Sequence, residues 1–165
     1  VLRTYQPDHG SLVDAVTALP ADTVSAPAAD SLDASLTLRA EIMAAIPEGV
    51  RPDPDEAGLA ETFAHAVRPE WPSWSTPLKR YLAAKAFASW AAYQGRGLLT
   101  IVRGLEAALA LVRVEAAREC HDAGRALDAD LLKQAFRGAD FALIHLAVAE
   151  DLAERWSRAE DQKSQ

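Results

Sequence analysis

The sequence predicts an all-α protein, an irregular helical bundle of five to seven helices whose core is formed by three long helices after residue 76. Apolar residues recur at spacings of three and four along most of the chain, which is the period of amphipathic helices. Half of the residues are hydrophobic but only 7% are aromatic, so alanine supplies much of the apolar content and helices can pack closely. No segment of the sequence shows the alternating pattern of a strand.

The first part of the chain is expected to contribute little to the core. Residues 1–30 contain a short helix, capped by Ser11 and ended by Pro20, and then a linker of Pro, Ser, Ala and Asp residues without apolar periodicity. We therefore expect a single helical-bundle domain over residues 31–160 and a polar tail over residues 161–165.

Two helices are expected in the first half of that domain. The first begins at Ser31 and is ended by the Pro-Glu-Gly sequence at residues 47–49. In the second, Asp53 is a candidate cap, Pro54 suits the first turn, and Glu56 completes the spacing of a capping box. Their apolar faces are Leu32, Leu36, Met43 and Ile46 in the first helix, and Leu59, Phe63 and Val67 in the second.

The loop over residues 68–77 precedes the three long helices. Its three prolines prevent a continuous helix, and either Ser75 or Thr76 caps the first long helix. The same loop carries Trp71 and Trp74. We interpret them as a lid over one end of the bundle in preference to a site for docking a partner.

The second long helix, which follows Gly97, is predicted to be the centre of the bundle because it is apolar on two faces. Gly124 ends it, and Asp128 caps the last long helix. The two faces of the central helix are Leu98, Val102, Leu105, Leu109, Val112 and Ala116, and Ile101, Leu111 and Val114. The stripe of the last helix is Leu131, Leu132, Ala135, Phe136, Ala139, Leu143 and Leu146.

Two glycines, Gly95 and Gly97, join the first two long helices. A glycine costs about 1 kcal/mol relative to alanine inside a helix, so the pair indicates either a break or a kink that admits a neighbouring backbone. A third alternative is an anion held at the start of the second helix beside Arg96. The sequence favours the break or kink, because neither dinucleotide nor phosphate-loop motifs are present.

Composition excludes several classes of function. The formal net charge of −7 argues against nucleic acid as the main partner. The single cysteine, Cys120, excludes a disulfide framework and a thiolate metal site within this chain. No apolar run is long enough to cross a membrane, and the first residues lack the apolar region of a signal peptide. We therefore expect a cytoplasmic protein.

Candidate catalytic groups are few. No two of His65, His121 and His145 are three or four residues apart, so no helix presents a ready pair of metal ligands. His145 lies near the predicted apolar stripe of the last helix, and we interpret it as a hydrogen-bonded packing residue. Cys120 lies near a helix C-terminus, where the dipole disfavours a thiolate. The sequence thus favours a non-catalytic protein without a metal or cofactor.

Three arginines, Arg96, Arg103 and Arg113, are spread along the central helix and its start, and two interpretations of them stay open. In the first they form a solvated face, with Arg103 paired to Glu106 three residues later. In the second they form a basic strip inside a cleft that holds a carboxylate or a phosphate.

A resemblance to a known family rests on three segments: LKRYLAAKAFASW, LLTIVRGLEAALALVRV and GRALDADLLKQAFRGADFALIHL. They resemble the carboxy-terminal helical half of YkgJ-type cysteine-cluster proteins, the flagellin lysine N-methylase-like family. The resemblance includes Asp140, Phe141 and His145 near the end of the third segment. The chemistry of that family is attributed to an amino-terminal cysteine cluster, whereas this chain has Cys120 alone. The resemblance therefore implies a divergent relative or a fragment of a lysine N-methylase-like protein, and it carries over no functional residue.

Two hypotheses of function follow. The first is a non-catalytic helical interaction or assembly module of a bacterial-type soluble protein, which packs against another protein or a second copy of itself. The second is a helical bundle that binds a small organic acid or a lipid in a pocket between its core helices. The residues predicted to line this pocket are Trp90, Tyr93, Arg96 and His145.

Overall fold

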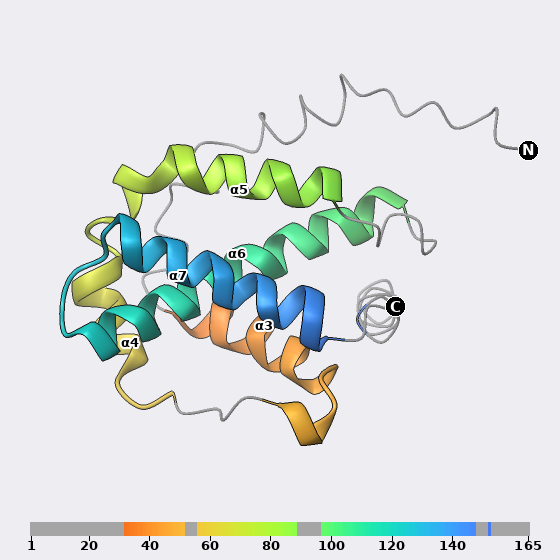
Figure 1. Cartoon of the computed structure of the whole chain (residues 1–165), viewed down its shortest axis with the longest axis horizontal. Helices are drawn as coiled ribbons and strands as arrows, with labels where there is room; N and C mark the ends of the chain where they lie inside the picture. Colours follow the sequence, from red (N-terminus) through yellow and green to blue (C-terminus); the bar gives the residue numbers. More distant parts are fainter. Residues whose placement is uncertain (1–31, 52–55, 89–96, 148–151, 153–165) are drawn as a thin grey trace, which may run out of the picture.

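The computed structural model describes residues 32–51, 56–88, 97–147 and 152 (Figure 1). Over these ranges the chain forms five α-helices and no strand, which confirms the all-α prediction. The helices are α3 (Asp33–Ala44), α4 (Leu59–Thr62), α5 (Ser75–Ala88), α6 (Gly97–Ala123) and α7 (Ala129–Asp140). Shorter turns complete them: the 3₁₀ turns η1 (Glu48–Val50) and η3 (Trp71–Trp74), and the π-helical turns η2 (Phe63–Val67) and η5 (Phe141–Leu146), which extend α4 and α7.

The central element is α6, as the sequence predicts for a helix that is apolar on two faces. It packs against α3, α4, α5 and α7, so almost every other helix buries its apolar side against it (Figure 1). Many of the buried positions are alanines, which let the helix axes approach closely. The buried apolar residues of α6 are Leu105, Ala107, Ala108, Leu109, Ala110, Leu111, Val112, Val114, Ala116, Ala117 and Cys120, whereas Val102 is exposed.

The core also includes a helix that precedes residue 76. Five apolar residues at or next to α3 are buried: Leu32, Ile42, Met43, Ala45 and Ile46. The helix ends at Ala44, shortly before Pro47, whose ring is incompatible with a helix interior. This matches the expected helix from Ser31 to the Pro-Glu-Gly sequence.

The start of α4 differs from the prediction. The helix begins at Leu59, and its N-cap is Gly58 in a left-handed conformation with φ of 74°, so Asp53 is not the cap of this helix. Glu56 does not complete a capping box, because its carboxylate is bound to Arg39. A Cβ atom on residue 58 would lie 3.3 Å from Cε1 of His121, so both the backbone and the space favour glycine there. Asp53 itself lies outside the described residues.

The tryptophan segment before α5 is a 3₁₀ turn rather than a lid. Trp71 is buried in the core, and Trp74 packs against that core from a partly exposed position. The turn runs directly into α5, which begins at Ser75. The lid interpretation is therefore wrong for Trp71.

The junctions around α6 follow the sequence signals. Helices α5 and α6 pack against each other, and the junction between them, residues 89–96, lies outside the described residues. Gly97 is the first residue of α6, whereas Gly95 lies outside the described residues. At the other end, Gly124 has φ of 61°, and the N–H of Arg125 bonds to the carbonyl of Cys120, as in a Schellman motif.

The predicted cap of α7 is confirmed. One carboxylate oxygen of Asp128 accepts hydrogen bonds from the backbone N–H groups of Asp130 and Leu131, both at 3.0 Å. These bonds satisfy two donors that the first turn of a helix leaves without intrahelical partners. α7 packs against α6, and its residues Leu131, Leu132, Ala135 and Ala139 are buried.

Candidate functional site

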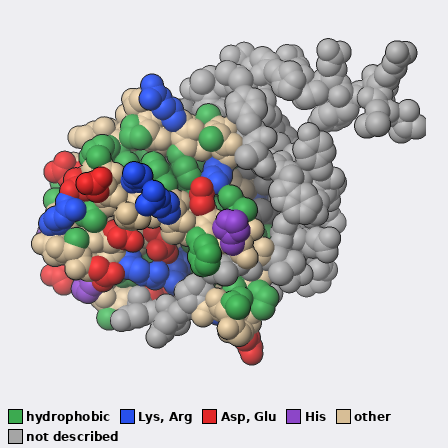
Figure 2. All heavy atoms as spheres, viewed as in Figure 1, with side chains coloured by type: hydrophobic (Ala, Val, Ile, Leu, Met, Phe, Trp, Pro, Cys, Tyr) green, Lys and Arg blue, Asp and Glu red, His purple; other side chains and the backbone are tan. Residues whose placement is uncertain are grey.

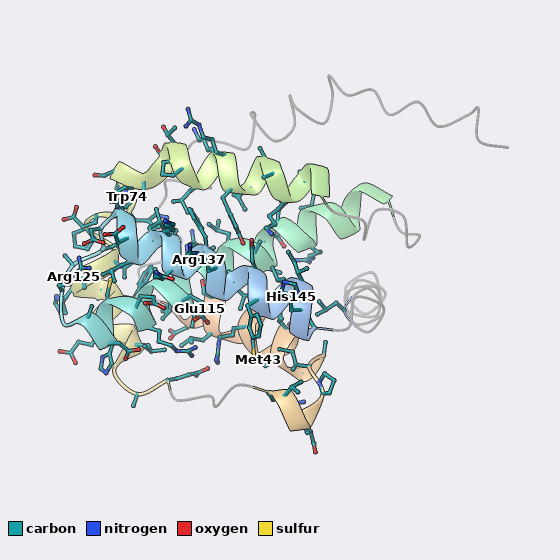
Figure 3. The ribbon with its side chains drawn as sticks, viewed as in Figure 1. Met43, Trp74, Glu115, Arg125, Arg137 and His145 are labelled. Atoms are coloured by element: carbon teal, nitrogen blue, oxygen red, sulfur yellow. The ribbon has the colours of Figure 1, made fainter. Side chains whose placement is uncertain are left out.

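Only one of the four predicted pocket residues lies in the described part of the chain. Trp90, Tyr93 and Arg96 lie outside the described residues. His145 is on η5, where its side chain is exposed and its ring centre lies 5.9 Å from that of Phe141 (Figure 3). The interpretation of His145 as a packing residue is therefore wrong. The physical reason is its position, since His145 follows Phe141 by four residues and Arg137 by eight, and both of these lie on the exposed side of the helix.

The outward side of α7 and η5 carries five exposed residues at helical spacing, which we call the outer stripe: Lys133, Arg137, Phe141, Ile144 and His145. Phe141 is 55% exposed and Ile144 is 59% exposed, although both are large apolar residues. Figure 2 shows basic, apolar and histidine side chains along this face of the molecule. Asp130 is exposed on the same face of α7, three residues before Lys133, so the cations of the stripe have one acidic neighbour in sequence.

A polar cluster joins α5 to the end of α7. The hydroxyl of Tyr81 donates a hydrogen bond to Oδ1 of Asp140 at 2.6 Å, and Nζ of Lys85 lies 2.6 Å from the same oxygen. Burial, followed by the hydrogen bond and the charge of Asp140, raises the pKa of Tyr81 well above its usual value. The phenol therefore keeps its proton, and the cluster acts as a connection between helices rather than as a catalytic base.

The thiol of Cys120 is unsuited to nucleophilic chemistry. It is buried within α6, and burial raises its pKa to about 11. The thiolate population at neutral pH is correspondingly small. This agrees with the inert role that the sequence suggested.

The histidine beside Cys120 makes a local contact. Nδ1 of His121 lies 3.2 Å from Oγ1 of Thr62, across the interface between α6 and α4. Within the described ranges, no group of three His, Cys, Asp or Glu side chains is placed to hold a metal ion.

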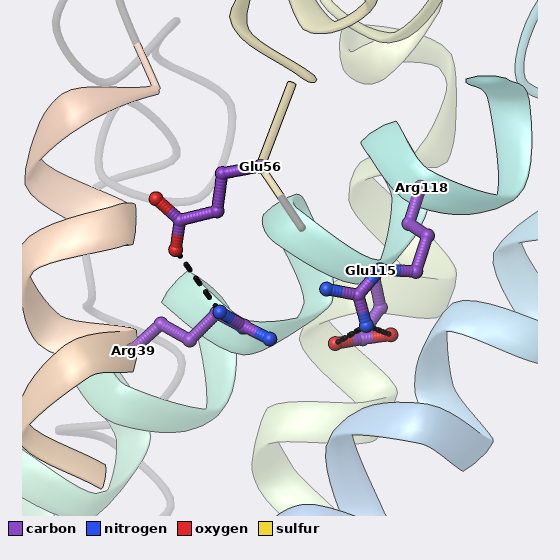
Figure 4. Close-up of polar contacts among 4 residues, drawn as sticks. All are labelled: Arg39, Glu56, Glu115 and Arg118. Carbon is purple, nitrogen blue, oxygen red and sulfur yellow. Dashed lines mark hydrogen bonds and ion pairs between the residues drawn. The ribbon is translucent and has the colours of Figure 1, made fainter. Parts of the chain in front are cut away.

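Arg39 is an almost completely buried arginine with a carboxylate partner. Its side chain comes from α3, is 1% exposed as a residue, and donates from Nη1 to Oε1 of Glu56 at 3.0 Å (Figure 4). Beside it, Arg118 binds Glu115 on α6, with both oxygens at 3.3 Å from Nη1. Glu115 fits against α7 because residue 138 is glycine: a Cβ there would lie 3.1 Å from Oε2 of Glu115. Both arginines therefore have a carboxylate partner, although Nε of Arg39 and Nη2 of Arg118 are buried without a hydrogen-bond partner.

Arg113 is also buried but has different surroundings. Its residue is 8% exposed, and its guanidinium carbon lies 5.7 Å from the centre of the Trp71 ring. Nη2 is buried without a hydrogen-bond partner, and no ion pair joins Arg113 to a carboxylate of the described residues. Burial lowers its pKa to about 10. Unpartnered guanidinium nitrogens also occur in Arg39 and Arg118, but both of these are bound to a carboxylate, and Arg113 is not bound to one among the described residues.

The structure separates the arginines that the sequence placed on one strip. Arg103 is partly exposed and binds Glu106 at 2.7 Å, so the interpretation as a solvated pair is confirmed for it. Arg113 lies in the interior beside Trp71, where that interpretation fails. The sequence already indicated this difference, because Arg103 and Arg113 are ten residues apart and therefore point about 80° away from each other around an α-helix.

No protein-family model, no curated protein and no solved structure matches this chain. None of the described helices combines the length and the apolar character needed to cross a bilayer.

Proposed function

We propose that this chain is a non-catalytic helical interaction module that binds a partner protein through the outer stripe. The observation that carries the proposal is the exposure of Phe141 and Ile144 side by side on η5. Large apolar side chains gathered on one face, and bordered by polar groups, are typical of docking surfaces. The rest of the described helical framework places most of its large apolar residues in the core.

The surroundings of the reactive side chains in the described residues support a non-catalytic role. Tyr81 is held protonated by burial and by Asp140, and the Cys120 thiol is buried with a raised pKa. His121 contacts Thr62, and His145 lies beside Phe141 on the surface. None of these arrangements pairs a nucleophile with a base.

The charge of the outer stripe indicates the chemistry of the partner. Lys133 and Arg137 are exposed at one end of the stripe, and the apolar pair follows along the same face. An acidic amphipathic helix fits this order, because its apolar side would cover Phe141 and Ile144 while its carboxylates face the two cations. A second copy of this chain fits less well, since two stripes in contact would bring like charges together.

The test uses a synthetic probe, an amphipathic peptide of about 18 residues with leucine on one face and glutamate on the other. We expect it to bind the wild-type protein, as measured by calorimetry and by shifts of amide resonances from α7 and η5. Phe141→Ser with Ile144→Ser should weaken binding by about tenfold or more. Val102→Ser is the matched control, because Val102 is another exposed apolar residue on a different helix.

Two further measurements distinguish the alternatives. A peptide of the same pattern with lysine in place of glutamate should bind less well, and the preference should weaken in high salt. Light scattering at high concentration reports self-association. The proposal is wrong if the acidic peptide binds the serine variant as well as the wild type, or if a stable dimer forms that the serine variant disrupts.

A further inference from the structure

A second candidate site lies where η3 meets α6, away from the outer stripe. Arg113 extends from α6 to the ring of Trp71, and its Nη2 is a buried donor without a partner. Nε1 of Trp74 is also a buried donor without a partner. Buried polar groups in proteins are generally hydrogen-bonded. The other unpartnered buried donors of the described residues, Nε of Arg39 and Nη2 of Arg118, belong to arginines that are bound to carboxylates, whereas Arg113 and Trp74 have no such partner.

Trp71 connects the two donors, because Arg113 packs on its ring and Trp74 follows it by three residues in η3. Side chains three residues apart are eclipsed in a 3₁₀ helix, so Trp74 lies on the face of η3 that carries Trp71. Arg113 packs on that face, with its guanidinium carbon 5.7 Å from the Trp71 ring centre. Trp74 is partly exposed and lies at the beginning of α5 (Figure 3), so this region is at the edge of the core and within reach of solvent.

From this arrangement we infer that Arg113 and Trp74 form a binding site for a small monocarboxylate. The guanidinium and the indole N–H supply two donors, which match the two oxygens of a carboxylate group. One positive charge is balanced by one negative charge. A phosphate dianion would leave a net negative charge in a largely desolvated place, so it fits the site less well. The rings of Trp71 and Trp74 would cover an apolar part of the ligand.

The inference is independent of the outer stripe. Its ligand is a small molecule rather than a protein, and its residues come from η3 and α6 rather than from α7 and η5. The double variant Phe141→Ser with Ile144→Ser should therefore bind carboxylates as the wild type does. Failure of one proposal leaves the other in place.

The first experiment compares sodium benzoate and sodium acetate with sodium chloride at constant ionic strength. We expect the thermal midpoint of the wild type to rise by about 3 °C when benzoate reaches roughly ten times its dissociation constant. Chloride should give no comparable shift. The benzoate shift should be lost in Arg113→Met and kept in Arg103→Met, which removes an arginine of the same helix that is bound to Glu106.

The second experiment observes the site directly through indole N–H resonances. Trp74→Phe keeps an aromatic ring, removes the donor and assigns the Trp74 signal. We expect this signal to move downfield on addition of benzoate in the wild type and to stay in place on addition of chloride. Arg113→Lys keeps the charge but removes the planar fork, so it should bind benzoate about tenfold more weakly even where Arg113→Met fails to fold.

Three results would overturn the inference. Benzoate that shifts the wild type no more than chloride does would exclude a carboxylate site. A benzoate shift that survives in Arg113→Met would place the binding elsewhere. A Trp74 signal that does not respond while the midpoint rises would remove Trp74 from the site.

Discussion

Two arginines are buried in the described core, and different groups surround their guanidinium groups. Arg39 reaches from α3 to the carboxylate of Glu56 at 3.0 Å. Arg113 reaches from α6 to the face of Trp71, with a buried Nη2 that no acceptor meets. A buried charge is tolerated when an opposite charge and hydrogen bonds replace the lost water, and it is costly when they do not.

The comparison indicates that Arg113 lowers the stability of the fold more than Arg39 does. Arg39 connects α3 to the segment before α4, so its charge has a structural use. Arg113 connects no pair of charges in the described residues, and its pKa is lowered by burial without an opposing carboxylate. A buried group that lowers stability and connects no two elements is a candidate for ligand binding, because functional sites often contain destabilising groups.

The largest effect is expected from removing the partner of Arg39. Glu56→Ala leaves a charge that is 1% exposed without its carboxylate. Because Glu56 itself is 39% exposed and water reaches the pair, we expect a loss of about 2 kcal/mol in the free energy of unfolding rather than the larger values of fully buried pairs. Urea unfolding measures it.

The double variant Arg39→Met with Glu56→Ala sharpens this result. It removes the buried charge as well as its partner, so most of the lost stability should return. Glu48→Ala is the control, because Glu48 is an exposed carboxylate of a neighbouring turn. A double variant as unstable as Glu56→Ala alone would show that the cost does not come from the unpaired charge.

A somewhat smaller loss of stability is expected from removing the hydroxyl of Tyr81. This hydroxyl donates a hydrogen bond to Asp140, whereas Nη2 of Arg113 has no acceptor. Tyr81→Phe removes a hydrogen bond to a charged group and should lower the free energy of unfolding by about 1.5 kcal/mol at pH 7. The pKa of Tyr81 is raised in the folded state, so the unfolded chain loses this proton at lower pH than the folded protein. The contribution is therefore complete below about pH 10 and is lost as the pH rises further.

Unfolding by urea at several pH values from neutral to strongly alkaline measures this dependence. The difference between the wild type and Tyr81→Phe should shrink above about pH 10. A difference that stays constant or grows through that range would mean that Tyr81 ionises at its ordinary pKa in the folded protein.

The fold was largely predictable because it depends on local signals. The two apolar faces of α6 and the cap at Asp128 are visible as spacings in the sequence, and the structure has both. The start of α4 was not predictable from the capping-box pattern, because Glu56 has a stronger partner in Arg39, 17 residues away in sequence. Tertiary pairing decides such competitions, and sequence spacing does not contain it.

The candidate sites were less predictable, for two physical reasons. His145 is exposed because it follows the exposed Phe141 by four residues, and the apolar character of Phe141 and Ile144 suggested a buried face there. Arg113 was one member of a suspected basic strip, but its isolation from carboxylates depends on what η3 and α5 place beside it. Trp90, Tyr93 and Arg96 stay predictions, since they lie outside the described residues.

A gain of stability is expected at Arg113 itself in the absence of ligand. Arg113→Met replaces a poorly compensated buried charge by an apolar chain of similar length, and we expect the free energy of unfolding to rise by about 1 kcal/mol. The same substitution at Arg39 should give no gain, because that charge is already paired. A loss of 1 kcal/mol or more in Arg113→Met would show that the guanidinium stabilises the fold.

Arg113 makes the stability of the wild type depend on pH with the opposite sign to Tyr81. The pKa of Arg113 is lowered to about 10, so above that pH the folded protein releases a proton that the unfolded chain still holds. Stability therefore rises with pH in this range, and the advantage of Arg113→Met should shrink. Measuring it in a Tyr81→Phe background separates the two groups, and an advantage that grows with pH would contradict the assignment.

The smallest effect is expected at an ion pair that is shorter than the one at Arg39. Arg103 and Glu106 are 2.7 Å apart, but their side chains are 31% and 49% exposed, so water already solvates both charges. Glu106→Ala should change the free energy of unfolding by no more than about 0.5 kcal/mol, and that change should disappear in high salt. Urea unfolding of Glu106→Ala and Glu56→Ala side by side separates burial from distance as the origin of the cost. Equal losses in the two variants would mean that burial does not set the value of these pairs, and the argument that Arg113 is costly would fail with it.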